Sequence, residues 1–220
     1  MTYSKENPSN EYLENLMYYK KMHKDGYKKR NEFIPSDATY VGISTKPFVS
    51  LIKKIIDLNQ CKSLLDYGCG KAKFYEEGFE TNKGKYPSLK DYWGIKINLY
   101  DPCVTKFDTL TKNRVDISIC IDVLEHIPAD DIDWVLDDFI SLTNKFVFIN
   151  VACYQARAIL PNGKNAHINI KEYEWWRDKL LFFAKKNNNI KIIAFCNFIS
   201  NDDKLIYRCI QINDEYKNYS

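Results

Sequence analysis

Residues 64–70 read Leu64-Leu65-Asp66-Tyr67-Gly68-Cys69-Gly70 and decide the fold. An apolar run gives way there to two glycines one residue apart, which is typical of a buried strand that turns directly into a helix. Glycine adopts backbone angles that other residues avoid, and it lets a ligand approach the main chain closely. Ligands of open α/β sheets bind beyond the carboxyl ends of the strands, where this loop falls. The loop is therefore the first candidate for a ligand site.

On both sides of this loop, apolar patterns of strand type alternate with patterns of helical type. Helical spacing is clearest at residues 48–56 and at residues 132–140, where Pro128 and an acidic first turn precede the helix. Such alternation predicts a mostly parallel sheet covered by helices. The short link between the last two strands predicts an antiparallel hairpin. The expected strands are residues 63–67, 92–100, 116–121, 146–151, 190–195 and 205–212.

Two segments lie outside this alternation. Residues 1–45 are polar but carry apolar side chains at helical spacing from Tyr12 to Tyr19, so we expect a helical extension that packs on the core. The main domain is then expected at residues 46–220. Within it, residues 76–91 contain two glycines and a proline that interrupt any long helix, and we interpret them as an insertion over the site.

Composition limits the classes of function. The chain has 220 residues, 45% of them hydrophobic, which suits one large domain with a real core. Its formal net charge of +3 creates no field that would indicate a nucleic-acid partner. The seven cysteines are odd in number and form no Cys-x-x-Cys pair, so we expect reduced thiols and a cytoplasmic protein. No cysteine or histidine spacing indicates a metal site, and no segment is apolar enough to predict a membrane span.

The residues around the two glycines distinguish between cofactors. A dinucleotide fingerprint needs a third glycine where this chain has Lys73, and no P-loop sequence is present. Asp66 lies two residues before the first glycine, where it would repel a pyrophosphate but attract an ammonium group. These features disfavour a nicotinamide oxidoreductase and favour a ligand such as S-adenosylmethionine, which carries an ammonium group.

The stretch Leu65-Asp66-Tyr67-Gly68-Cys69-Gly70-Lys71-Ala72 resembles the first motif of class I S-adenosylmethionine-dependent methyltransferases, with Ala72 in place of the usual third glycine. Residues 119–128, Ile-Cys-Ile-Asp-Val-Leu-Glu-His-Ile-Pro, resemble the region of their fourth strand. Residues 19–23 and 160–167 are similar to phrases of an uncharacterised bacterial and phage branch. The resemblance, which covers mainly residues 60–150, implies an α/β, Rossmann-like, doubly wound sheet of the seven-stranded type with a C-terminal antiparallel hairpin.

The resemblance also implies roles for individual residues. Asp101, at the end of the next strand, would accept hydrogen bonds from ribose hydroxyl groups. His126 and His167 are candidate catalytic bases, because an imidazole titrates near neutral pH. The remaining cofactor-binding candidates are Asp66, Tyr67, Gly68, Cys69, Gly70, Pro102, Asp122 and Val123, and the substrate-binding candidates are Glu125, Tyr154, Arg157, Lys164 and Asn165.

We therefore expect transfer of a methyl group from S-adenosylmethionine to an oxygen or nitrogen of a small molecule or glycan. Enzymes that methylate the amino groups of DNA bases carry an Asn/Asp/Ser-Pro-Pro-aromatic motif where this chain has Asp122-Val123-Leu124-Glu125. The only Pro-Cys pair, Pro102-Cys103, follows an earlier strand than the nucleophile of cytosine C5 enzymes does. The alternative is a methyltransferase-like module that binds the nucleoside or a protein without catalysis, because a fold does not guarantee chemistry.

Overall fold

A computed structural model describes residues 3–213, so the ends of the two expected segments, residues 1–2 and 214–220, lie outside the described part. Within it, the central sheet has six strands in the order β10-β9-β8-β7-β3-β6. All neighbouring pairs are parallel except β9 and β10, which form an antiparallel hairpin at one edge. The strands are β3 (Ser63–Tyr67), β6 (Lys96–Tyr100), β7 (Val115–Ile121), β8 (Thr143–Ala152), β9 (Lys191–Ile199) and β10 (Leu205–Ile212).

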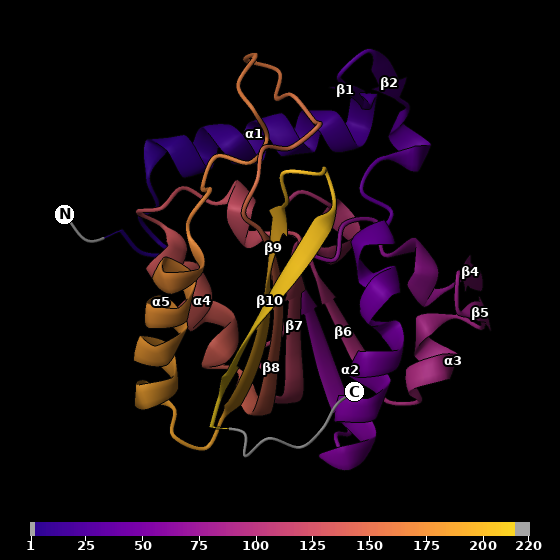
Figure 1. Ribbon diagram of the computed structural model, residues 1–220, viewed down its shortest axis with the longest axis vertical. Coiled ribbons are helices and arrows are strands. Elements are labelled where there is room, and N and C mark those ends of the chain that lie inside the picture. The colour runs from indigo at the N-terminus through magenta and orange to yellow at the C-terminus, as the bar shows by residue number, and fades with distance from the viewer. Residues whose placement is uncertain (1–2, 214–220) are drawn as a thin grey trace.

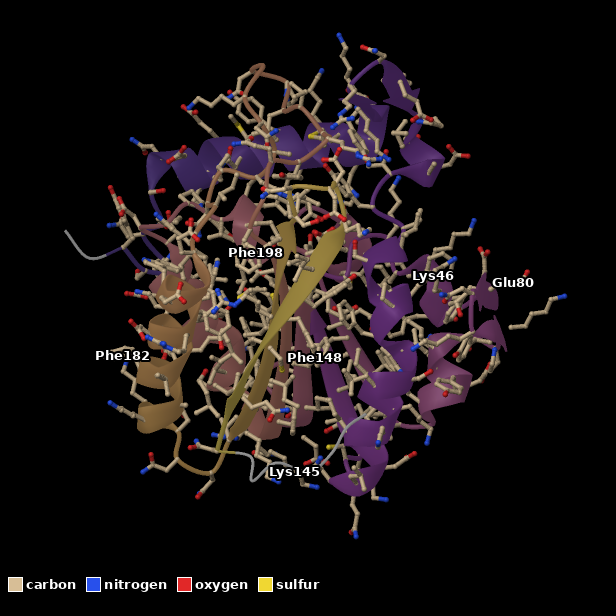
Figure 2. All side chains as sticks on the ribbon, in the orientation of Figure 1. Lys46, Glu80, Lys145, Phe148, Phe182 and Phe198 are labelled. Atoms are coloured by element: carbon tan, nitrogen blue, oxygen red, sulfur yellow. The ribbon has the colours of Figure 1, made fainter. Side chains whose placement is uncertain are left out.

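Helices cover both faces of this sheet (Figure 1). Helices α2 (Val49–Leu58) and α3 (Leu89–Trp93) pack on one face, and α4 (Ile132–Ile140) and α5 (Tyr173–Lys186) pack on the other. Strand β8 shows why, because its side chains alternate between the faces: Val147 and Ile149 belong to the α4/α5 core, whereas Phe148 belongs to the α2 core. Phe148 lies at the middle of the sheet, whereas the half-exposed Phe182 lies on the outer side of α5 (Figure 2).

The strand order reverses next to β3. The chain runs from β3 to β6 on one side and then crosses to β7 on the other side, before continuing to β8 and β9. In open parallel sheets, the crevice at such a reversal is the usual place for a ligand. Here it lies between the carboxyl ends of β3 and β7.

These observations confirm an α/β fold with a mostly parallel sheet and a C-terminal antiparallel hairpin. The bounds of β3, β10 and α4 agree with the expected ranges. In the described part of the chain, the central sheet has six strands, one fewer than the expected seven.

The strand expected at residues 92–100 is wrong in its first half. Tyr92 and Trp93 belong to α3, and β6 begins only at Lys96. Ser88 caps α3 by accepting a hydrogen bond from the backbone N–H of Asp91, and Gly94 ends the helix in a left-handed conformation. These local capping interactions override the strand propensity of the aromatic residues.

The segment at residues 76–91 does not lie over the site. It forms a small hairpin, β4 (Phe79–Thr81) with β5 (Gly84–Tyr86), which lies beside α2 and α3 (Figure 1). Phe79 stacks on Tyr86 with 5.4 Å between ring centroids, and the hydroxyl groups of Tyr86 and Ser50 of α2 are 3.0 Å apart. The segment thus extends the core on the α2 face.

The first helix, α1 (Asn10–Asp25), crosses the carboxyl ends of the parallel strands (Figure 1). A short hairpin, β1 (Tyr27–Lys29) with β2 (Glu32–Ile34), follows it. Tyr12 of α1 is buried in the α4/α5 core and packs edge-on against Trp134 at 5.0 Å between centroids. Within residues 3–213, no helix combines the length and apolarity that crossing a membrane requires.

Candidate functional site

A cavity of about 120 Å³ lies between α1 and the carboxyl ends of β3, β6 and β7. Its volume is smaller than the roughly 300–1,000 Å³ of most small-molecule sites, and the cavity opens to solvent. The cavity occupies the place where the strand order reverses. Its lining residues are Tyr12, Asn15, Leu16, Tyr19, His23, Tyr40, Gly68, Gly70, Asp101, Pro102, Cys103, Asp122, Val123, His126 and Ile127.

The glycine loop forms the floor of the cavity. Gly68 has a φ of +86°, and a Cβ atom placed there would lie 2.4 Å from Cγ2 of Val123, which also lines the cavity. The backbone N–H groups of Gly68 and Cys69 both donate to the carbonyl oxygen of Tyr100, at 2.7 and 3.0 Å. These bonds hold the loop against the end of β6, and only glycine fits between that strand end and Val123.

Asp101 fixes the same loop from the end of β6. One carboxylate oxygen accepts from the backbone N–H of Gly70 at 2.9 Å, and the other accepts from that of Cys103 at 2.8 Å. Burial raises the pKa of Asp101, although both hydrogen bonds oppose this shift. Each carboxylate oxygen has a second lone pair, so Asp101 retains capacity to accept from a ligand in the cavity.

Three residues of the predicted cofactor motif have buried side chains that do not line the cavity. Tyr67 and Cys69 are buried in the two cores on opposite faces of the sheet. Asp66 is buried and accepts a hydrogen bond from the Tyr75 hydroxyl at 2.8 Å. Burial raises its pKa to about 7, despite the opposing effect of that hydrogen bond. A direct contact between Asp66 and a ligand stays a prediction.

Helix α1 provides the roof, which the sequence did not indicate as part of the site. Asn15, Tyr19 and His23 are spaced four residues apart and line the cavity together. The buried Nδ2 of Asn15 and Nδ1 of His23 have no hydrogen-bond partner within residues 3–213. Buried polar atoms without partners are rare and indicate a place for a ligand or water. In the sequence, the polar residues at positions i, i+4 and i+8 on the inward face of α1 could have indicated that this helix lines a site.

Several bonds hold this roof in place. Asp131 is fully buried and accepts from both the backbone N–H and the hydroxyl of Ser9, the N-cap residue of α1. At the middle of the helix, the Tyr19 hydroxyl lies 2.7 Å from Nδ1 of His126 and donates to the carbonyl oxygen of Ala166 at 3.2 Å. The roof is thus attached to the segments that follow β7 and β8.

Next to the cavity, four side chains with potential metal-ligand atoms come together. The ligand atoms of Asp122, Glu125, His126 and His167 all lie within 4.8 Å of one another. Asp122 follows β7 directly and has a φ of +61°, which is unusual for a residue other than glycine. Cysteine and histidine spacing in the sequence predicted no metal site, because this cluster joins an Asp-x-x-Glu-His sequence to a distant histidine.

The charges in this cluster are strongly coupled. Although burial opposes it, the pKa of Asp122 is lowered, because His126 and a 2.7 Å hydrogen bond from the Ser44 hydroxyl stabilise its ionised form. Burial and the neighbouring Asp122 raise the pKa of Glu125 well above its usual range. Burial and His167 lower the pKa of His126 to about 4, and burial lowers that of His167. Both imidazoles are therefore neutral at pH 7.

The predicted substrate-binding residues after β8 do not line the cavity. The side chains of Arg157 and Lys164 are exposed. Asn165 is engaged within its own loop, because its side chain bonds the backbone of Ala156 and accepts from the N–H of His167. The carbonyl oxygen of Tyr154 lies 2.6 Å from Nδ1 of His167. Asn165 and Tyr154 thus position His167.

The cavity has a definite electrostatic preference. Among the described residues, those that line it include the carboxylates Asp101 and Asp122 but neither Lys nor Arg. Such a site favours a cationic or neutral polar ligand over a phosphate.

Comparison with models of known protein families finds no match to this chain, and comparison with curated proteins finds none either.

Proposed function

We propose that this chain is an S-adenosylmethionine-dependent methyltransferase that acts on an oxygen or nitrogen of a small molecule or glycan. The observation that carries the proposal is the cavity itself. It lies at the strand-order reversal of a parallel sheet, with Gly68 and Gly70 as its floor and two carboxylates in its wall. We also propose that the sheet is a variant of the Rossmann-like, doubly wound type, because helices cover both of its faces.

The charge of the cavity supports this donor over a dinucleotide. S-adenosylmethionine carries an ammonium and a sulfonium group, whereas a dinucleotide carries a pyrophosphate that would need Lys, Arg or free backbone N–H groups. In the described part of the chain, the N–H groups of Gly68 and Gly70 are already donated to Tyr100 and Asp101. The loop therefore has little capacity left to bind a phosphate.

The lining residues suit the parts of the donor. Asp101 has lone pairs available for ribose hydroxyl groups, and Gly68 lets the ligand approach the main chain. The unpartnered atoms of Asn15 and His23 can bond polar atoms of the ligand from above. Asp66 lies beneath the loop. We therefore propose that its negative charge attracts the ammonium group across the loop without touching it.

When bound, the donor supplies the methyl group already activated as an electrophile, so the protein mainly positions the acceptor and removes its proton where necessary. His126 lines the cavity and is neutral, with Nε2 as its remaining basic atom. A pKa of about 4 makes it a weak base. This weakness is the observation that favours the alternative, a module that binds the donor without transferring its methyl group.

Isothermal titration with S-adenosylmethionine, S-adenosylhomocysteine and NAD tests the proposal. We expect the first two to bind and NAD to show no heat of binding. The reverse result would refute the assignment. Incubation with methyl-labelled donor and a metabolite extract then distinguishes an enzyme, which labels an acceptor, from a module that only binds.

A matched pair of variants connects binding to the cavity. Gly68→Ala places a Cβ atom 2.4 Å from Val123 and should weaken donor binding at least tenfold. Gly163→Ala is the control, because Gly163 has nearly the same φ, +85°, but no atom within 4 Å of an added Cβ. Both variants introduce backbone strain of about 1–2 kcal/mol, so only the clash at Gly68 distinguishes them. Equal affinities in the two variants would place the donor elsewhere.

A further inference from the structure

We propose that Asp122, Glu125, His126 and His167 form a binding site for a first-row divalent metal ion. Their ligand atoms all lie within 4.8 Å of one another. Ligands about 2.1 Å from an ion are about 3 Å apart when adjacent and about 4.2 Å apart when opposite. The four atoms thus need only small movements to surround one ion.

The hydrogen bonds of the two histidines prepare them for this role. Nδ1 of His167 lies 2.6 Å from the carbonyl oxygen of Tyr154, and Nδ1 of His126 lies 2.9 Å from that of Ala166. A carbonyl oxygen only accepts, so Nδ1 of His167 carries the proton and its Nε2 keeps a lone pair. Nδ1 of His126 also lies 2.7 Å from the Tyr19 hydroxyl, which donates its proton to the Ala166 carbonyl and so can accept from Nδ1. In this arrangement Nε2 of His126 keeps a lone pair as well. Metal-binding histidines typically donate their second N–H to a backbone carbonyl in this way.

Glu125 supplies an independent indication of a ligand. Its side chain is completely buried, and Oε1 accepts from the backbone N–H of Ala152 at 2.8 Å. Its other oxygen, Oε2, is buried and receives no hydrogen bond from a donor group of the described residues, while the side chain faces the carboxylate of Asp122. An unpartnered buried carboxylate oxygen is costly unless something satisfies it, and a cation in the cluster would do so.

The backbone also directs these groups towards one point. Asp122 keeps its left-handed conformation through a 3.0 Å bond from its N–H to the carbonyl oxygen of Asn150 and a bond from the Ser44 hydroxyl to its carboxylate. The carbonyl oxygen of Glu125 accepts from the N–H groups of Ile168 and Asn169, both at 3.0 Å. That pair of bonds brings the loop with His167 beside the turn that follows β7.

The ligand set indicates which ions would bind. Two imidazoles with two carboxylates suit Mn²⁺, Fe²⁺ or Zn²⁺, whereas Mg²⁺ and Ca²⁺ prefer oxygen ligands alone. Asp122 and His126 also line the cavity. An ion held by four side chains would have coordination positions left for an oxygen atom of a molecule bound in the cavity.

Titration of the full-length protein with MnCl₂, followed by the electron paramagnetic resonance signal of free Mn²⁺, tests the site without donor or substrate. We expect one ion per chain, with MgCl₂ in tenfold excess competing poorly. Glu125→Gln and His167→Gln should each lower Mn²⁺ affinity at least ~100-fold, since even the loss of an outer-shell partner costs about 10–100-fold. His23→Gln, which changes the third histidine of the chain, should leave it unchanged.

Circular dichroism of each variant shows whether it folds, and Glu125→Gln retains the shape of the side chain. Should one variant unfold, the other still decides the outcome. Wild-type affinity in a folded Glu125→Gln or His167→Gln protein overturns the site, as does an equal loss in His23→Gln. Because the titration contains no donor, its result is independent of whether S-adenosylmethionine binds.

Discussion

Replacement of Asp66 by Asn should stabilise the folded protein at pH 8 and weaken its binding of S-adenosylmethionine. Asp66 is buried beneath the glycine loop, and its pKa is raised to about 7 from the ordinary value of 3.8. A raised pKa in the folded state means that folding favours the protonated acid. Above pH 7 the folded protein must bury an ionised carboxylate, whereas asparagine carries no charge and can still accept the hydrogen bond from Tyr75.

The magnitude follows from the two pKa values. The contribution of Asp66 to the free energy of unfolding is fully present below pH 3.8 and is lost as the pH rises through about 7. The difference between the pKa values of 3.8 and about 7 corresponds to a loss of roughly 4 kcal/mol in the free energy of unfolding. The difference in stability between Asp66→Asn and wild type should therefore grow by that amount between pH 4 and pH 8, in favour of the variant.

Urea unfolding at half-unit steps from pH 4 to pH 8 measures this difference, with Asp130→Asn as the control at an exposed carboxylate. Titration with S-adenosylmethionine over the upper part of this range should show wild-type affinity increasing as the pH rises to about 7, because the ammonium group attracts ionised Asp66. The affinity of Asp66→Asn should be weaker and independent of this ionisation. Parallel stability curves for Asp66→Asn and wild type would refute the assigned burial, and parallel binding curves would refute the assigned attraction.

Two further predictions concern the roof of the cavity. Ser9→Ala removes the N-cap of α1 and one bond to Asp131, so it should lower the free energy of unfolding by about 2 kcal/mol, whereas the control Ser4→Ala should change it by less than ~0.5 kcal/mol. Thermal melting of both variants measures this, and equal melting temperatures would show that Asp131 does not anchor the helix. Tyr19→Phe removes the hydroxyl next to Nδ1 of His126 and should cost about 1 kcal/mol in urea unfolding. An equal cost in Tyr18→Phe would mean that the Tyr19 hydroxyl contributes nothing specific.

The sequence predicted the parts of the fold that depend on local patterns. The strand at residues 63–67 and the helix at residues 132–140 agree with β3 and α4, because burial on a sheet or against it imposes a periodicity that can be read directly. The strand predicted at residues 92–93 is wrong for a reason that is also local. There, the capping of α3 by Ser88 and Gly94 outweighs the preference of Tyr92 and Trp93 for strands.

The candidate site was less accessible to prediction because it depends on long-range contacts. Gly68, Gly70 and Asp101 were identified as site residues, since they follow strands whose ends must meet. The place of His167 beside Glu125 depends on a loop that returns after β8, and no local pattern encodes such a return. For the same reason, the apolar stripe of α1 indicated packing but not that Asn15 would face a cavity.

The attachment of α1 has a consequence for the order in which this chain folds during synthesis. The helix is made before the other described elements, yet its anchor Asp131 comes 122 residues after Ser9, and Ala166 comes 147 residues after Tyr19. Such distant contacts close large loops and form late. We therefore expect the nascent chain to keep the apolar stripe of α1 exposed until most of the sheet has left the ribosome. The cavity would be the last part of the molecule to assemble, and its roof is the segment most exposed to chaperones in the interval.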